Sequence, residues 1–188
     1  MAIKTFTAGS VLTASDTNTY LANSGLVYVG SASVAGATSF FLDSCFSSTY
    51  DSYKVLFTST GGGSAADITM KLRSGGADDS SLVYSYARFY GYSSGGSVLL
   101  NSGENGTSVY VGTQLAGGGS IAMEIFSPNK AFITSFTAAN AAFQTATPYS
   151  FNNNSSGTIN TTTQYTGIKL LSAAAITGTL TVYGYRKA

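Results

Sequence analysis

The sequence has no histidine and no tryptophan, and its 188 residues include one cysteine and two prolines. Without histidine, the chain has no Ser-His or Cys-His catalytic pair and no imidazole ligand for a metal. The stretch Gly91–Gly95 matches the G-x-S-x-G pattern of hydrolases. Because the usual general base does not exist here, we interpret this stretch as a serine–glycine turn. Cys45 cannot form an intrachain disulfide, and we expect it to be a buried apolar side chain.

Charge is equally scarce: charged residues make up 9% of the chain, and the formal net charge is +1. Lys71 and Arg73 share a predicted strand face, and Arg186 precedes Lys187, but neither pair forms the basic patch that a phosphate backbone requires. No apolar run follows Lys4 as in a secretory signal, and no stretch approaches the roughly 20 apolar residues of a membrane span. We therefore expect cytoplasmic synthesis, no membrane insertion and no nucleic-acid partner. A net charge near zero also favours self-association.

The acidic residues lack the spacing of a catalytic pair or a metal-binding loop. Asp78 and Asp79 are adjacent and point apart in an extended chain, whereas Glu104 falls in a predicted turn and Glu124 in a predicted strand. Glycoside hydrolysis requires two carboxyl groups roughly 5 to 10 Å apart, and no pattern indicates such a pair. We expect no catalytic residue, no cofactor and no metal.

From Leu26 onward, apolar and polar residues alternate with a period of two. Tyr53, Val55 and Phe57 share one face, and so do Ile68, Met70 and Leu72, which is typical of strands with one buried face. This pattern predicts an all-β fold, an antiparallel β-sandwich resembling a jelly roll, over residues 26–188. The stretch 138–146 is predicted as either a short helix or a loop across the end of the sandwich. The predicted turns are Gly61–Gly63, Ser74–Gly76, Ser93–Gly96, Asn105–Gly106, Gly117–Gly119 and Asn152–Asn154.

Residues 1–25 follow a different pattern and form the other predicted unit. Thr13 is a candidate N-cap, with Asp16 three residues later, and the segment ends at Gly25. A helix of two to three turns is marginal alone, so we expect it to dock on its own domain, on a sister chain or on another protein. The apolar residues predicted to make this attachment are Ile3, Phe6, Val11, Leu12, Tyr20 and Leu21.

Four tyrosines fall within nine residues. Tyr84 and Tyr86 are expected to cover one face of the sheet, with their hydroxyls in water. Tyr90 and Tyr92 lead into a Ser/Gly-rich turn, where tyrosines supply large and rigid contact surfaces. For this second pair, contact with a receptor and packing on the sheet are equally favoured. The receptor would be a surface polysaccharide or a protein.

Three stretches resemble parts of known virion proteins. Lys4–Gly9, Val11–Ala14 and Asp16–Leu21 together resemble an opening segment of tailed-bacteriophage structural proteins, where it precedes tail-fibre, baseplate-associated and other virion modules. Phe46–Val55 is similar to the first core strand of a sandwich common in these proteins, and Gly178–Arg186 to its last strand. Ser10 departs from the pattern, since that position often carries a glutamate.

The resemblance implies a non-enzymatic building block located in the virion. It implies a homotrimer or another symmetric oligomer, held to other virion proteins through residues 1–25. We expect a tail-fibre or baseplate-associated module used in host attachment. A decoration or cement protein that stabilises the capsid or tail is the alternative, and a glycan-degrading fibre is the least favoured reading.

Overall fold

The computed structural model describes residues 7–11, 13–16, 25–62, 64–146 and 148–186. Over these residues the chain forms one 11-stranded sheet in which the paired strands are antiparallel. The strands are β1 (Leu26–Leu42), β2 (Ser52–Gly62), β3 (Ala66–Ser74), β4 (Ala77–Asp78), β5 (Tyr84–Tyr92), β6 (Val98–Gly106), β7 (Val109–Gln114), β8 (Gly119–Phe126), β9 (Thr134–Gln144), β10 (Tyr149–Ile159) and β11 (Gly167–Tyr185).

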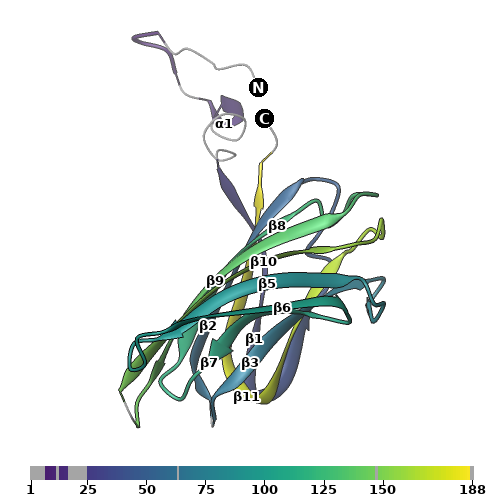
Figure 1. The fold of residues 1–188 in the computed structure, drawn as a ribbon. Helices are drawn as coiled ribbons and strands as arrows, with labels where there is room; N and C mark the ends of the chain where they lie inside the picture. The colour runs from purple at the N-terminus through teal and green to yellow at the C-terminus, as the bar shows by residue number, and fades with distance from the viewer. Residues whose placement is uncertain (1–6, 12, 17–24, 63, 147, 187–188) are drawn as a thin grey trace.

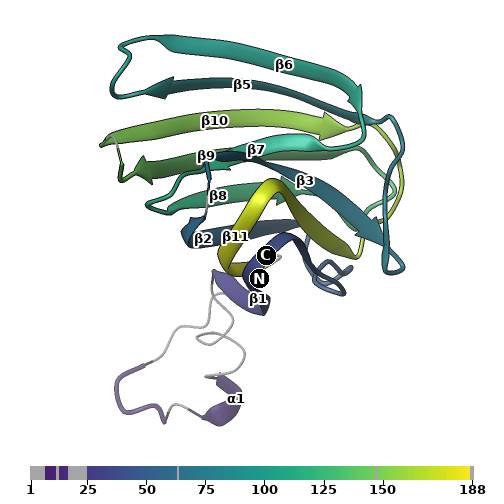
Figure 2. The same ribbon diagram turned by 90° about the horizontal axis from the view of Figure 1, so that it is seen from below.

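The long strand β11 organises the sheet. Its first part, 167–172, pairs with β3, and its second part, 176–184, pairs with β2, while β1 follows it along most of its length. From β2 the order continues through β8, β9, β10 and β5 to β6. The sheet therefore curls (Figures 1 and 2), and β7, which pairs with β3, contacts β9, β10 and β5.

The core lies inside this curl and follows the predicted alternation. Tyr53, Val55 and Phe57 on β2 are buried, as are Ile68, Met70 and Leu72 on β3. Cys45 is also buried, as expected, and burial raises the pKa of its thiol to about 12. The all-β antiparallel prediction is confirmed. The finer prediction of a jelly-roll sandwich is not, because the strands join in one continuous curled sheet.

Two local predictions are wrong. The stretch 138–146, predicted as a helix or a loop, mostly continues strand β9 to Gln144. The Asn152–Asn154 cluster, predicted as a turn, lies inside β10 and pairs on one side with β9 and on the other with β5. In both cases the ladder on each side satisfies the backbone and overrides the weak local signal.

The predicted N-terminal helix is not seen in the described part of the chain. Only Ala14–Asp16 are helical there, which is less than one turn, and residues 17–24 lie outside the described residues. No described helix is long and apolar enough to cross a membrane.

Arg73 departs from the expected exposed face of β3, since only 7% of its surface is exposed. Its Nε and Nη2 donate to the two carboxylate oxygens of Asp43 at 2.7 and 3.2 Å, and Nη1 donates to Asp78. Lys169 of β11 lies 2.6 Å from the other oxygen of Asp78. Two cations and two carboxylates thus balance, and this ion cluster joins β3, β4 and β11 to the chain after β1.

Candidate functional site

The outer face of the sheet, away from the core, carries three rows of side chains over β8, β9, β10, β5 and β6. The register places Ala122 beside Ala139, and Asn154 between Ala139 and Phe89, with Leu100 at the end of this row. On β8, β9 and β10 these side chains are exposed because their neighbours along the strand point into the core, whereas β6 is exposed along most of its length. The flanking rows are Glu124, Thr137, Ser156, Ala87 and Ser102 on one side, and Ser120, Ala141, Asn152, Gly91 and Val98 on the other.

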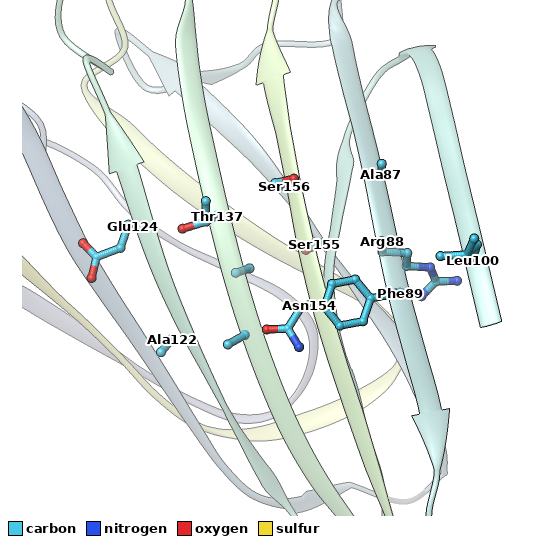
Figure 3. A pocket seen from close by; sticks show the side chains of 12 residues that line it. Ala87, Arg88, Phe89, Leu100, Ala122, Glu124, Thr137, Asn154, Ser155 and Ser156 are labelled. Atoms are coloured by element: carbon cyan, nitrogen blue, oxygen red, sulfur yellow. The ribbon is translucent and has the colours of Figure 1, made fainter. Parts of the chain in front are cut away.

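A hollow of about 590 Å³ lies over these rows (Figure 3). We call it the outer trough and define it by Ala87, Phe89, Leu100, Ala122, Glu124, Thr137, Ala139, Asn154 and Ser156. A second hollow of about 300 Å³, beside the β5–β6 turn, shares Phe89 and Asn154 with it. A third of about 460 Å³ shares Asn152 with the second. The depression therefore extends along the face formed by β9, β10 and β5.

Glu124 is the one carboxylate among the residues that line the outer trough. Its Oε1 lies 3.3 Å from Lys54 Nζ on the neighbouring strand and accepts a hydrogen bond from the Tyr185 hydroxyl at 2.8 Å. The carboxylate raises the pKa of Tyr185, because its negative charge favours the protonated phenol that donates to it. The trough carries no net charge once this ion pair is counted.

Arg88 lines the hollow, but its guanidinium is turned to the other side of the sheet. The guanidinium carbon lies 3.3 Å from the centre of the Tyr110 ring and 4.5 Å from that of Tyr90. Its side chain is 11% exposed and lies 4.0 Å from Asp67. The charge of Arg88 is therefore engaged under β7 and does not face the outer trough.

Tyr90 and Tyr92 lie together on the inner side of the sheet. Both rings contact Phe151, at 5.7 and 5.1 Å between centroids, and Tyr92 also meets Tyr149 at 5.6 Å. Tyr90 is half-buried against the small core of Leu115, Ala142 and Phe151, whereas Tyr92 keeps 39% of its surface exposed. Tyr92 thus offers more surface to a receptor, and the receptor role of the pair stays a prediction.

Of the other two tyrosines in the cluster, Tyr84 departs from the expected solvent-facing hydroxyl, whereas the Tyr86 hydroxyl lies in an exposed hydrogen bond. Tyr84 is fully buried, and its hydroxyl oxygen accepts a hydrogen bond from the Leu72 N–H at 3.0 Å. Tyr86 is half-buried and donates to Asn101 Oδ1 at 3.0 Å.

Of the predicted attachment residues, only Val11 is described, and 82% of its surface is exposed. Ile3, Phe6, Leu12, Tyr20 and Leu21 lie outside the described residues, so their role stays a prediction.

The acidic residues form no metal centre within the described ranges, where no three of them, with or without Cys45, come together. Asp78 is held by Arg73 and Lys169, and Asp79 accepts a hydrogen bond from the Tyr165 hydroxyl. Glu124 faces no second carboxylate in the outer trough, so the two-acid geometry of glycosidases is not assembled there.

Sequence reasoning missed Phe89, Leu100, Asn154 and the alanines that floor the outer trough. The signal was the alternation of exposed and buried positions in 137–143 and 152–156, which was hidden because both sets of residues are small or polar. Comparison with known proteins finds no protein family, no curated protein and no solved structure that matches the chain.

Proposed function

We propose that the chain is a non-enzymatic structural protein of a tailed-bacteriophage virion that takes part in host attachment. Residues 1–25 would hold it to other virion proteins, and the curled sheet, which we regard as a jelly-roll-like head, would face the host. The sequence resemblance of the N-terminal segment motivates this role, and the position of β1, to which that segment is joined, relative to the outer trough supports it.

The observation that carries the proposal is that strand β1, which follows the N-terminal segment, and strand β6 lie at opposite edges of the sheet. The N-terminal segment joins β1 at Leu26, which pairs with Tyr185 of β11. Six strands (β11, β2, β8, β9, β10 and β5) separate β1 from β6, so the two edges are about 34 Å apart along the sheet. Figure 2 shows β5 and β6 on the side of the sheet away from β1. An anchor at one edge leaves the trough at the other edge free to meet a host surface.

A test of the anchor uses the exposure of Val11. Replacing Val11 by aspartate should leave folding intact, because the side chain is exposed, and should lower the amount of the chain in purified particles, measured by quantitative mass spectrometry. Leu82→Asp, at an exposed position between β4 and β5, is the matched control. Equal incorporation of both variants would contradict the anchor.

The location and number of copies test the wider role. A cryo-electron microscopy map of the particle should place the chain at the tail tip or fibres in a few symmetric copies. Placement over the capsid in many copies would instead make it a decoration protein. Absence of the chain from the particle would end the virion proposal.

We also propose that the head self-associates through β6, whose outer edge is unpaired in the sheet. Val98, Leu99 and Leu100 are 71%, 44% and 83% exposed, and β6 carries a single charge, Glu104. A strand edge that begins with three exposed apolar residues and has no lysine or proline is a template for strand pairing. Antiparallel pairing of two copies centred on Leu99 would set Val98 against Leu100 and keep the two Glu104 side chains far apart.

Sedimentation of the full chain tests this contact. Leu99→Lys should shift the protein toward monomer, because two lysines would face each other at the centre of the pairing. Phe132→Lys, at a position 66% exposed outside β6, is the control. A wild-type protein that is already monomeric at high concentration would contradict the contact. A trimer unaffected by Leu99→Lys would show that the copies meet elsewhere.

A further inference from the structure

We propose that the outer trough and the hollow beside the β5–β6 turn bind an uncharged polysaccharide chain, with pyranose rings packed on Phe89 and Leu100. Its hydroxyls would bond to Asn154 in the trough and to Asn152 in the adjoining hollow. This inference rests on the proposed role in host attachment and names the class of surface molecule that the head would recognise.

The shape of the depression suits an extended ligand. Its floor is formed by Ala122, Ala139 and Ala87, whose side chains are too short to fill the space above the backbone. The main hollow of about 590 Å³ falls within the range of small-molecule sites, and its neighbour shares Phe89 and Asn154 with it. A ligand that occupies both hollows must be longer than one compact molecule, which fits several linked sugar rings.

The walls of the trough carry the two kinds of group that a sugar needs. Phe89 is 51% exposed and Leu100 is 83% exposed, so they offer an apolar surface to the C–H face of a ring. The exposed amide of Asn154 lies beside the Phe89 ring on the adjacent strand (Figure 3). An amide provides two donors and one acceptor, which matches the mixed donor and acceptor character of neighbouring sugar hydroxyls.

The absence of an uncompensated charge in the trough distinguishes among the classes of ligand that could occupy it. Glu124 is compensated by Lys54, and Arg88 is engaged with Tyr110 and Asp67 on the other side of the sheet. The trough therefore has no positive field for nucleic acids or acidic polysaccharides. Protein hot spots favour Trp, Tyr and Arg anchors in deep pockets, whereas this floor is mostly alanine and serine. An uncharged glycan is the ligand that remains.

The test measures binding of the purified full chain to polysaccharides by titration calorimetry and affinity electrophoresis. The probes are dextran, mannan and the polysaccharide extracted from the host surface, with alginate as the acidic control. Phe89→Ala and Asn154→Ala are the test variants, and Phe132→Ala is the matched control, since Phe132 is 66% exposed outside the trough. All variants are first compared with the wild type by circular dichroism and melting temperature.

We expect a neutral polysaccharide to bind and each test variant to weaken binding by about tenfold or more, with Phe132→Ala unchanged. The inference is overturned if only alginate binds, or if Phe89→Ala and Asn154→Ala bind the neutral probe as the wild type does. Loss of self-association in these variants, with no glycan bound by the wild type, would make the trough a contact between copies and would also overturn it.

Binding to intact host cells separates this inference from the proposed function. If the wild type binds cells and the two trough variants bind equally well, host attachment stands and the trough assignment fails. The opposite outcome is that the wild type binds a neutral polysaccharide but no cells, and that Phe89→Ala abolishes the polysaccharide binding. The trough assignment then stands and host attachment fails. If neither cells nor polysaccharides are bound, both fail.

Discussion

Replacing Arg73 by methionine should lower the melting temperature of the protein by about 6 to 12 °C. Arg73 is 7% exposed and holds Asp43 through two hydrogen bonds, while also contacting Asp78 and the Gly76 carbonyl. Its guanidinium carbon lies 4.3 Å from the centre of the Phe41 ring. Removing one partner of a buried ion pair costs about 3 to 5 kcal/mol.

The lower part of that range applies here, because the carboxylates can regain some water. The side chains of Asp43 and Asp78 are 32% and 25% exposed, so we expect a loss of about 3 kcal/mol in the free energy of unfolding. For a chain of this length, each kcal/mol shifts the melting temperature by about 2 to 4 °C. Arg73→Lys should lie between the wild type and Arg73→Met, since lysine keeps the charge but not the two-pronged contact.

Calorimetry and urea unfolding at pH 7 provide the assay, with Lys130→Met as the control. Lys130 pairs with Asp51 at 2.8 Å on the surface, where both side chains are 40% or more exposed. Such surface pairs contribute about 0 to 1 kcal/mol. An Arg73→Met protein that melts within 2 °C of the wild type, or no lower than Lys130→Met, would refute the assignment of the cluster as a major stabilising contact.

The same cluster predicts a pH dependence. Partial burial raises the pKa of Asp78, but the hydrogen bond and charge of Lys169 and the charge of Arg73 outweigh it, so the pKa lies below its ordinary 3.8. A carboxyl whose pKa is lowered by folding stabilises the protein above its unfolded pKa. We therefore expect this contribution to be complete near pH 5 and above and to be lost as the pH falls below 3.8. Arg73→Met should flatten this acid loss, and an identical pH profile in the variant would contradict the coupling.

Three further predictions concern the core. Gly157→Ala should destabilise the fold by several kcal/mol, because the added Cβ would collide with the Ser85 carbonyl oxygen, and urea unfolding that matches the wild type would contradict this. The Cys45 thiol, with its pKa raised to about 12 and 2% of its surface exposed, should react with a thiol reagent only after denaturation, so fast labelling of the native protein would contradict its burial. Asn153→Leu should raise the free energy of unfolding by about 1 kcal/mol, because both polar atoms of the Asn153 amide are buried without a hydrogen-bond partner. A clear loss of stability of the variant in calorimetry would contradict this and show that the amide is hydrogen-bonded in solution.

How much of this fold the sequence predicts depends on the contrast between the two faces of each strand. On β2 and β3 the apolar buried positions are Tyr, Val, Phe, Ile, Met and Leu, and they alternate mostly with polar residues. Both strands and their apolar faces were therefore predicted correctly, and the buried Arg73 on the opposite face was not. On β9 the buried Ala138 and Ala142 alternate with the exposed Ala139 and Ala141. Because one alanine resembles another, the period of two leaves no hydrophobic trace there. The alternation up to Thr137 was predicted as a strand, and only its continuation to Gln144 was missed.

The outer trough was hidden for a related reason. Asn152, Asn153 and Asn154 resemble a turn when only neighbours along the chain are considered. In the fold, pairing with β9 and β5 supplies their backbone partners. The middle asparagine points inward, while Asn154 faces the trough and Asn152 the adjoining hollow. Pairing between strands far apart in sequence creates the site, and no local signal in a single sequence encodes that pairing.

These two causes also explain why the proposed anchor and the proposed head differ in what the sequence can reveal. The proposed attachment segment is recognisable because its resemblance to virion proteins is carried by consecutive residues. A recognition surface built across five strands depends on register: a one-residue slip of β10 would turn Asn152 and Asn154 into the core and expose Asn153. The same register holds the adjoining buried face, so selection for a stable core would also preserve the geometry of the trough. The outward side chains contribute little to the core, so we expect substitutions there to change the proposed recognition surface more than the stability of the fold.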